Sequence, residues 1–404
     1  MKIKVLGAGR EVGRSCIQIE GEKKIIMDCG VKLQPEPPTY PFLGDVDVDF
    51  AILSHAHLDH CGGMPLIGKT PVYMNDITLE LATLLIKDSI KVGKKQGYGT
   101  PFGNQDLKKF IKNAKIVNYG ERFKSCRLYD SGHIPGSSGI MLEKEGLFYT
   151  GDVQTAESNL LRPAKFPPSC RTLVIESTYS QRNHLLREQE ERNLIESVEE
   201  ALSKDETALM PVFAVGRAQE VMLILKKFAG KIALDGMTRA ASEIVSHYGT
   251  YLKNQKEFKR VLRSAHIVEK GADRDKVLKK YPIIIASAGM LGGGPAVNYL
   301  SKISHREESK VLFTGFLVDE SPGSNLIKTK IFHNEDEKFD VSCEVKQFNL
   351  SAHADRRGLM SIIEKLHPEN VLCVHGDSCK AFADELRERG INAFAPKSGE
   401  EVRV

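Results

Sequence analysis

Short runs of apolar residues, separated by glycine or charged turns, fill the first part of the chain. These runs are typical of strands, which we expect at 3–6, 16–19, 24–27, 50–53, 115–118, 127–129, 140–142, 147–150 and 173–175. Between them, residues 76–92 carry leucine and isoleucine at helical spacing and predict a helix that Gly93 would cap. A strand-rich unit with occasional helices predicts sheets covered by helices.

After about residue 180 the pattern changes to strands that alternate with helices. An amphipathic helix over 188–202 leads into strands at 208–213, 231–234, 282–286 and 311–316, with helices at 218–228 and in a charged stretch to about 265. From 344 a last run predicts strands at 344–348 and 371–374 and helices at 357–366 and 379–389. We therefore predict an α/β protein whose first domain, 1–179, is interrupted by an α/β insertion, 180–345, and resumes over 346–404.

Composition and charge narrow the class of protein only a little. The 404 residues are 41% hydrophobic and 27% charged, with a formal charge of +4, which is ordinary for a globular protein and neither demands nor opposes a polyanionic partner. The opening MKIKVLGAGR has no apolar core of a signal peptide, and no apolar run is long enough to span a bilayer. The eight scattered cysteines indicate reduced thiols. We expect a cytoplasmic protein that does not enter a membrane.

The segment Ser54-His55-Ala56-His57-Leu58-Asp59-His60 carries the clearest chemical signal. It directly follows a predicted strand, and three imidazoles and a carboxylate within six residues cannot be explained by packing. His55 and His57 are two residues apart, so they point the same way on an extended backbone, whereas Asp59 and His60 face a second centre. Nitrogen and oxygen ligands of this mixture suit zinc best, with manganese or iron as alternatives.

Two metals need more ligands than one motif supplies, and further candidates lie where other strands end. His133, Asp152 and His375 each stand in a glycine turn that follows a predicted strand. Glu176 ends another strand, and His353 lies in Leu350-Ser351-Ala352-His353-Ala354-Asp355. A carboxylate at a strand end is usually a helix cap or a salt-bridge partner, but beside a metal it can orient a histidine that protonates a leaving group. The remaining histidines we assign structural roles: His184, His247, His266, His305, His333 and His367.

These residues together resemble the metallo-β-lactamase superfamily. The matching positions are Asp28, His55, His57, Asp59, His60, His133 and Asp152, and Glu176, His353 and His375 match the three further motifs of the β-CASP branch. The opening Gly7-Ala8-Gly9-Arg10-Glu11-Val12-Gly13-Arg14-Ser15 and the Ser-Ala-His-Ala-Asp motif are similar to the endonuclease subunit of the cleavage and polyadenylation specificity factor, and to its short archaeal homologues without KH domains. The resemblance covers essentially the whole chain.

The resemblance implies an αββα sandwich with an inserted β-CASP domain, and a role for each motif residue. His55, His57 and His133 would hold one zinc ion, Asp59, His60 and His375 the other, and Asp152 would bridge both. Asp28 would orient the histidine loop, and His353, paired with Glu176, would be the general acid beside the catalytic carboxylates of Asp59 and Asp152. Two Zn²⁺ ions are expected, with Mn²⁺ as the alternative. A histidine at position 375 goes with RNA substrates in this family.

Several features of the insertion suit a nucleic-acid backbone. The glycine-rich run Ser287-Ala288-Gly289-Met290 follows a buried strand, although relatives carry proline where Ala288 stands, which leaves the shape of this loop open. We predict RNA contacts at Arg217, Ser287, Gly289, Gly315, Phe316 and Ser351. Lysines cluster over 87–115, and basic residues over 253–263; each cluster could track phosphates, and each is equally typical of a solvated helix face.

The sequence thus predicts a zinc-dependent ribonuclease of RNA processing, 3′-end formation or decay. It would cut single-stranded RNA as an endonuclease, with 5′–3′ exonuclease activity as a second mode, and relatives suggest a homodimer. A glyoxalase-II-like thioesterase shares the His-x-His-x-Asp-His core, but the long insertion and the three further motifs argue against it. An inactive RNA-binding scaffold would have lost metal ligands, and all of them are present here.

Overall fold

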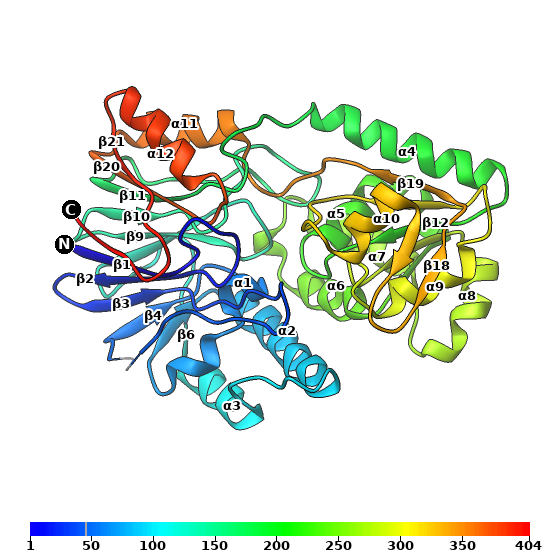
Figure 1. Ribbon diagram of the computed structural model, residues 1–404, viewed down its shortest axis with the longest axis horizontal. Helices are drawn as coiled ribbons and strands as arrows, with labels where there is room; N and C mark the ends of the chain where they lie inside the picture. Colours follow the sequence, from blue (N-terminus) through cyan, green and yellow to red (C-terminus); the bar gives the residue numbers. More distant parts are fainter. Residues whose placement is uncertain (45–46) are drawn as a thin grey trace. The chain divides into compact units, whose positions relative to one another are not determined.

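The computed structural model describes residues 1–44 and 47–404, and they form two compact units (Figure 1). Unit 1 contains Met1–Glu157, Arg162–Asn183 and His353–Val404, and unit 2 contains Ser158–Leu161 and His184–Ala352. Unit 1 is therefore assembled from both ends of the chain. Every candidate metal ligand lies within it.

Unit 1 has two sheets of seven strands each. The first sheet has the order β22-β1-β2-β3-β4-β5-β6, and the second has the order β21-β20-β11-β10-β9-β8-β7. The strands of the first are β1 (Lys2–Gly7), β2 (Cys16–Glu20), β3 (Lys24–Met27), β4 (Phe50–Ile52), β5 (Val72–Met74), β6 (Ala114–Ile116) and β22 (Glu401–Arg403). Those of the second are β7 (Arg122–Phe123), β8 (Cys126–Asp130), β9 (Ser138–Leu142), β10 (Leu147–Tyr149), β11 (Thr172–Glu176), β20 (Asn370–Val374) and β21 (Asn392–Phe394).

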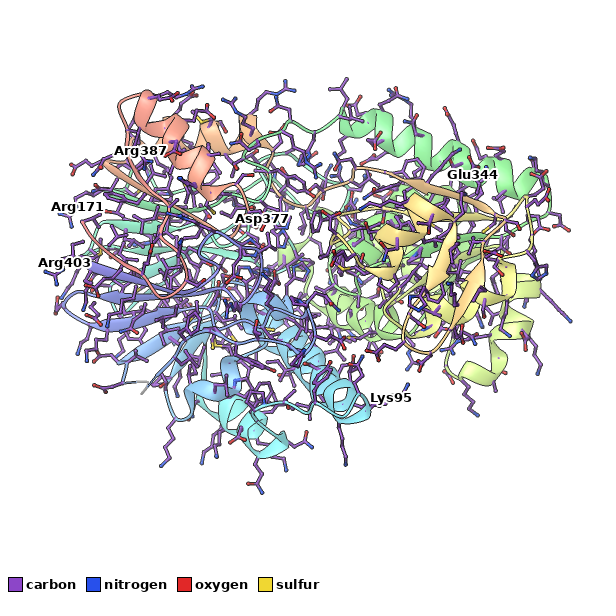
Figure 2. The ribbon with its side chains drawn as sticks, in the orientation of Figure 1. Lys95, Arg171, Glu344, Asp377, Arg387 and Arg403 are labelled. Carbon is purple, nitrogen blue, oxygen red and sulfur yellow. The ribbon has the colours of Figure 1, made fainter. Side chains whose placement is uncertain are left out.

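Alternation along the strands of the second sheet supplies two cores. In β11, Val174 packs into the core shared by the two sheets, whereas Leu173 and Ile175 pack into a second core with α11 (Arg356–Leu366) and α12 (Cys379–Glu388). Successive strand residues point to opposite faces, so a strand covered on both sides is apolar throughout. Figure 2 shows charged side chains such as Arg171 and Arg403 at the periphery of the unit.

Helices cover the outer faces of both sheets. The helices α1 (Leu58–Cys61), α2 (Asp76–Lys95) and α3 (Asn104–Asn113) accompany the first sheet, and α11 and α12 the second (Figure 1). This arrangement is the αββα sandwich that the resemblance implies. It brings the ends of strands from both sheets, and the loops that follow them, to one edge of the unit, where the candidate ligands lie.

Unit 2 is built around a six-stranded parallel sheet of order β14-β13-β15-β12-β16-β19. Its strands are β12 (Ala208–Pro211), β13 (Ile232–Asp235), β14 (His266–Ile267), β15 (Ile283–Ala286), β16 (Lys310–Phe313) and β19 (Glu344–Gln347), with a separate hairpin of β17 (Ile331–His333) and β18 (Lys338–Asp340). Its α-helices are α4 (Arg187–Ser203), α5 (Arg217–Ile224), α6 (Met237–His247), α7 (Gln255–Ser264), α8 (Arg274–Lys280), α9 (Pro295–Ile303) and α10 (Pro322–Thr329). The predicted α/β class is confirmed.

Some boundaries differ from those expected. Helix α2 continues through Gly93 to Lys95, so the prediction that Gly93 caps it is wrong: this glycine is buried, and a Cβ there would lie 2.8 Å from the carbonyl oxygen of Gly99. The predicted helix 218–228 ends at Ile224 and gives way to a 3₁₀ segment, and the charged stretch to 265 is two helices, α6 and α7. Helix α3 was not predicted, because it buries only Leu107 and Phe110 and leaves little apolar periodicity.

All eight cysteines are buried and none forms a disulfide among the residues that the structure describes. Over the same residues, none of the helices combines the length and the apolar character that a bilayer crossing requires.

Candidate metal centre

The histidine loop after β4 is held by two segments, one that precedes β2 and one that follows β3. The backbone N–H of Ser15 donates to the carbonyl of Asp59 (2.7 Å), and that of Cys29 donates to the carbonyl of His60 (2.9 Å). Gly30 makes this approach possible, since a Cβ at that position would lie 1.7 Å from the carbonyl oxygen of Asp59. The sequence analysis did not single out Gly30.

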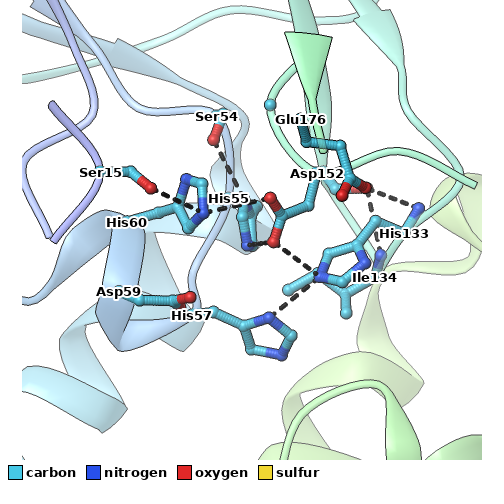
Figure 3. Close-up of polar contacts among 12 residues, drawn as sticks. Ser15, Ser54, His55, His57, Asp59, His60, His133, Ile134, Asp152 and Glu176 are labelled. Atoms are coloured by element: carbon cyan, nitrogen blue, oxygen red, sulfur yellow. Dashed lines mark hydrogen bonds and ion pairs between the residues drawn. The ribbon is translucent and has the colours of Figure 1, made fainter. Parts of the chain in front are cut away.

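A first group of ligand atoms gathers around one oxygen of Asp152 (Figure 3). Nε2 of His55 and Nε2 of His133 lie 3.5 and 3.6 Å from Oδ2 of Asp152. The ring of His57 completes the group, with its Nδ1 3.0 Å from Nε2 of His133. Loops after β4, β8 and β10 thus bring four predicted ligands together.

A second group gathers around the other oxygen of Asp152. Nε2 of His60 lies 3.2 Å from Oδ1 of Asp152, and Nδ1 of His375 lies 3.3 Å from the same oxygen. Asp59 joins through Oδ2, which is 3.2 Å from Nε2 of His375. The two oxygens of Asp152 therefore face different groups, which is the position of a bridging carboxylate.

The spacing of these atoms fits bound metal ions better than hydrogen bonding. Ligands at about 2.0–2.2 Å from a tetrahedral zinc ion lie roughly 3.3–3.6 Å from one another, close to the separations of 3.0–3.6 Å seen here. Nε2 of His55 and Oδ1 of Asp152 are fully buried and have no hydrogen-bond partner among the described residues. Buried polar atoms are almost always paired, so these two orphaned atoms mark a place for a cation.

The charges of the groups suit metal ligands. Burial and the neighbouring His60 hold the pKa of His55 well below its ordinary value, so that imidazole is neutral. Burial raises the pKa of Asp152, but His375 and His60 outweigh burial and hold that pKa well below its ordinary value. Burial likewise raises the pKa of Asp59, but His375 and His60 outweigh burial, so the pKa of Asp59 also lies below its ordinary value. Metals bind neutral imidazoles and ionised carboxylates, so His55 and the two carboxylates are already in the state that a metal ion requires. Burial lowers the pKa of His60, but the carboxylates of Asp152 and Asp28 outweigh burial and raise that pKa well above its ordinary value, so a metal ion would displace a proton from this ring.

Asp28 is buried behind the second group and accepts hydrogen bonds from three residues. Its Oδ1 accepts from the backbone N–H of Ser54 (2.7 Å). Its Oδ2 accepts from the hydroxyls of Ser54 (2.7 Å) and Tyr149 (2.8 Å) and lies 2.7 Å from Nδ1 of His60. A bond at Nδ1 leaves Nε2 of His60 directed at Asp152, so Asp28 fixes the orientation of this ring. Tyr149 carries no motif, and the sequence did not indicate its part.

Glu176 and His353 form a pair beside the first group. Nδ1 of His353 lies 2.9 Å from Oε1 of Glu176, and its Nε2 lies 3.9 Å from Oδ2 of Asp152. The backbone N–H of Val153 donates to the same Oε1 (3.1 Å), which fixes the carboxylate. Burial lowers the pKa of His353, but the carboxylates of Glu176 and Asp152 outweigh burial and raise the pKa to about 9. His353 is therefore a protonated imidazole near neutral pH.

His57, Asp59 and His353 are the partly exposed members of the three groups that the described residues form, and the others are buried. This is the side from which a substrate can reach the centre. The histidines assigned structural roles lie elsewhere; His266, for example, stacks on Tyr281 with ring centroids 4.4 Å apart.

Four of the six predicted RNA-contacting residues lie together in unit 2. Gly289, Arg217, Gly315 and Phe316 line a cavity of about 10 Å³, together with Phe213. Ser287 is not among the lining residues, because its hydroxyl accepts from the backbone N–H of Met237 at the start of α6 (3.1 Å). Ser351 is buried, and its carbonyl accepts from Arg187 (3.5 Å).

This cavity lies at the carboxyl ends of β12, β15 and β16. The chain leaves the neighbouring strands β12 and β15 in opposite directions, toward β13 and β16 respectively. In open α/β sheets such a reversal marks the usual position of a ligand. Phe213 and Phe316 are each 39% exposed there, so both rings are accessible for stacking.

Comparison with known proteins gives matches along most of the chain. Residues 1–186 match the family model of the Anti-Pycsar protein Apyc1, residues 218–326 match the Beta-Casp domain, and residues 338–396 match the Zn-dependent metallo-hydrolase RNA specificity domain. A crystal structure of a protein of unknown function from Enterococcus faecalis V583 matches with a TM-score of 0.59 and 15% identity, covering 100% of this chain and 99% of that one, and shows the fold alone.

Curated relatives match over the full length of the chain. The probable RNase MJ4 of Methanocaldococcus jannaschii is 37% identical over 100% of both chains. The RNase aCSPSF2 of Saccharolobus solfataricus is 33% identical, over 100% of this chain and 85% of its own. The transcription termination factor FttA of M. jannaschii is also 33% identical, over 100% of this chain and 72% of its own. With the fold and the clustered histidines and aspartates, these matches show that the chain belongs to the metal-dependent β-CASP ribonucleases of the metallo-β-lactamase fold.

Proposed function

We propose that the protein hydrolyses phosphodiester bonds within single-stranded RNA at a centre of two zinc ions. The observation that supports two ions most directly is Asp152, because each of its oxygens faces a separate group of ligand atoms. One group without the other would need only one of these oxygens. Manganese is the alternative ion that the same nitrogen and oxygen ligands accommodate.

Each residue of the centre has a place in this proposal. His55, His57, His133 and Asp152 would hold one ion, and Asp59, His60, His375 and Asp152 the other. A two-zinc centre supplies Lewis-acid stabilisation of charge on phosphate oxygens and an acidified water. Asp28 orients His60, and the neutral state of His55 and the ionised state of Asp152 keep both available as ligands.

His353 would protonate the oxygen that leaves the RNA chain. Its Nδ1 faces Glu176, so the proton at Nε2 is the one directed toward the centre, 3.9 Å from Asp152. A general acid must hold its proton at the working pH and release it only to the leaving group. Glu176 helps His353 to hold its proton at the working pH, because the carboxylate of Glu176 raises the pKa of His353.

RNA as the substrate is supported by the comparisons and by unit 2. The RNA specificity domain model spans residues 338–396, which include His353 and His375, and relatives of this chain carry the name RNase. In unit 2, Phe213 and Phe316 could each stack on a base, and Arg217, at the start of α5, could bind the adjoining phosphate. Gly289 packs closely on the backbone of Val212 and Phe213, and Gly315 packs on the side chain of Arg217, so the two glycines hold these groups together.

The alternatives have less support. A thioesterase of the glyoxalase-II type would use the two ligand groups, but it would have no evident use for the Glu176–His353 pair or for unit 2. An inactive scaffold would not keep seven ligands in place. A homodimer and a cytoplasmic location stay predictions; light scattering would measure the first, and cell fractionation the second.

Cleavage of a single-stranded RNA that carries both an internal and a 5′ label tests the proposal. We expect internal fragments of intermediate length, with zinc restoring the activity of chelator-treated protein. Mononucleotides released from the 5′ end without such fragments would mean an exonuclease. Intact RNA together with rapid hydrolysis of a thioester would refute the proposal and leave the metal centre in place.

A further inference from the structure

A basic surface on α2 and α3 of unit 1 is not accounted for by the metal centre. It consists of exposed lysines on the second half of α2, on α3 and on the adjoining strand β6: Lys87, Lys91, Lys94, Lys95, Lys108, Lys109, Lys112 and Lys115. Figure 1 shows α2 and α3 side by side, and Figure 2 shows Lys95 at the far end of α2. Residues 87–115 carry a net charge of +6, so the rest of the chain, whose total is +4, is slightly negative. The positive charge of this protein is concentrated here.

These lysines differ from exposed lysines elsewhere in the chain. Lys204, Lys227 and Lys302, for example, each form an ion pair with a carboxylate. Of the eight surface lysines, Lys109 alone forms an ion pair among the described residues, with Asp106 at 2.9 Å. The second acidic residue of the stretch, Asp88, is partly buried and interacts electrostatically with Lys91, but the described residues show no ion pair between them. The protein therefore presents this charge to solvent instead of neutralising it.

Helix stability does not explain the arrangement. Lysines in the last turn of a helix interact favourably with its dipole, which accounts for Lys94, Lys95 and Lys112. Lys87, Lys91 and Lys108 lie outside those turns, and each has another lysine four residues along the helix. Like charges at this spacing face each other and repel, so these three positions weaken their helices. A polyanion bound across them would remove that repulsion.

Helix α2 connects this surface to the metal centre. The side chains of Asn75 and Thr78, at its start, both donate to the carbonyl of Gly136 in the loop that carries His133 (2.8 and 3.0 Å). An α-helix rises about 1.5 Å per residue, so the lysines from 87 to 95 lie roughly 17–29 Å along the axis from Asp76. A stacked strand that rises about 3.4 Å per nucleotide covers this distance in roughly five to eight nucleotides.

We propose that the lysine surface of α2 and α3 binds the phosphate backbone of the RNA substrate several nucleotides away from the bond that is cut. This inference rests on the proposed function and adds a second contact, which gives the enzyme affinity for long RNA. Charge favours RNA over a protein partner, because the eight lysines are all exposed and outnumber the exposed apolar side chains among them, which are Val92, Ile111 and Ile116.

The test uses the full chain with three lysines replaced, K87Q/K91Q/K108Q, beside the matched control K204Q/K227Q/K302Q, which removes the same charge from ion-paired lysines. Anisotropy measures binding to RNAs of 4 and 25 nucleotides at several salt concentrations, and cleavage is measured in parallel. We expect K87Q/K91Q/K108Q to bind the 25-mer about tenfold more weakly, with a log–log salt slope shallower by about 2, and to bind the 4-mer normally. Its kcat and zinc content should equal those of the wild type, and the control should bind both RNAs normally.

Three results would overturn the inference: unchanged binding of the 25-mer, equal losses for the 4-mer and the 25-mer, or a control that behaves like the variant. Loss of binding to vesicles containing phosphatidylserine, with RNA binding intact, would assign the surface to anionic membranes and also overturn it. The proposed function fails separately: if RNA binds through these lysines but is never cut, the surface stands and the nuclease assignment does not.

Discussion

Replacing Asp28 by asparagine tests how the centre is built, because this change keeps the size of the side chain and removes its charge. Oδ1 of Asp28 accepts one hydrogen bond and Oδ2 accepts from three donors. An amide nitrogen cannot accept any of them. The asparagine amide loses fewest hydrogen bonds when its oxygen takes the place of Oδ2 and its nitrogen takes the place of Oδ1. The nitrogen then faces the backbone N–H of Ser54 and leaves that buried donor unpaired, which lowers the free energy of unfolding by about 1–3 kcal/mol.

The effect on the metals should be unequal. The bond to Nδ1 of His60 changes from charged to neutral, and the ring is held less firmly toward Asp152. Loss of a partner that orients a metal-bound histidine typically weakens metal affinity by about 10–100-fold. We therefore expect the zinc ion of the Asp59, His60 and His375 group to bind about 10–100-fold more weakly. The ion of the His55, His57 and His133 group should be retained.

Chelator competition on the zinc-loaded protein measures both affinities, and two variants serve as controls. Tyr149→Phe removes one donor to Oδ2 and keeps the charge, so its zinc affinities should change by less than about threefold. Asp235→Asn removes the charge of another buried carboxylate, which Arg274 and Tyr299 bind in unit 2. It should lower the melting temperature without releasing zinc. Equal zinc loss in Asp28→Asn and Asp235→Asn, or unchanged zinc affinity in Asp28→Asn, would refute the reasoning.

Three further predictions concern the same unit. Gly30→Ala would place a Cβ 1.7 Å from a carbonyl oxygen of the histidine loop. We expect it to lower the free energy of unfolding by about 3 kcal/mol or more in a denaturant titration, and to release zinc. Gly230→Ala is the control, because a Cβ there meets no atom within 4 Å and should change the free energy of unfolding little. Glu176→Gln removes a charge that raises the pKa of His353, so the alkaline limb of kcat against pH should move down from about 9 by about one pH unit or more; an unmoved limb would exclude His353 as the acid. Burial raises the pKa of Asp130 from 3.8 to about 6, so the folded state is penalised as pH rises through that window and fully above it. Asp130→Asn should therefore stabilise the protein by about 1–2 kcal/mol more at pH 8 than at pH 4, a figure reduced because the side chain is partly exposed, and equal gains at both pH values would contradict the assignment.

Local patterns of apolar residues predicted most of the fold. Strands covered on both faces, such as β11, are apolar throughout, and the long helix α2 has a regular apolar stripe, so both were predicted within a few residues. The edge strands β7, β14, β21 and β22 and the helix α3 were missed, because elements with two buried residues or fewer have little periodicity to detect. The return of β22 to pair with β1 depends on contacts across nearly the whole chain, which no local pattern contains.

Motif residues of the site were visible in the sequence, and their supports were not. Three imidazoles in six residues identify His55, His57 and His60 without a structure, and the glycine turns after strands indicated His133 and His375. Tyr149 acts through a hydrogen bond, and Gly30 acts through a backbone contact. Both contacts exist only once β10 and the segments that follow β3 and β4 have come together. Such residues resemble ordinary core positions until the fold is known.

The most direct test of the central claim is a zinc titration of the metal-free protein, followed at each step by cleavage of a single-stranded RNA. If Asp152 joins two ions, cleavage should appear as the second equivalent of zinc binds, and Asp152→Ala should remain inactive at every zinc concentration. Full cleavage with one equivalent of zinc, or an active Asp152→Ala variant, would contradict a two-metal ribonuclease.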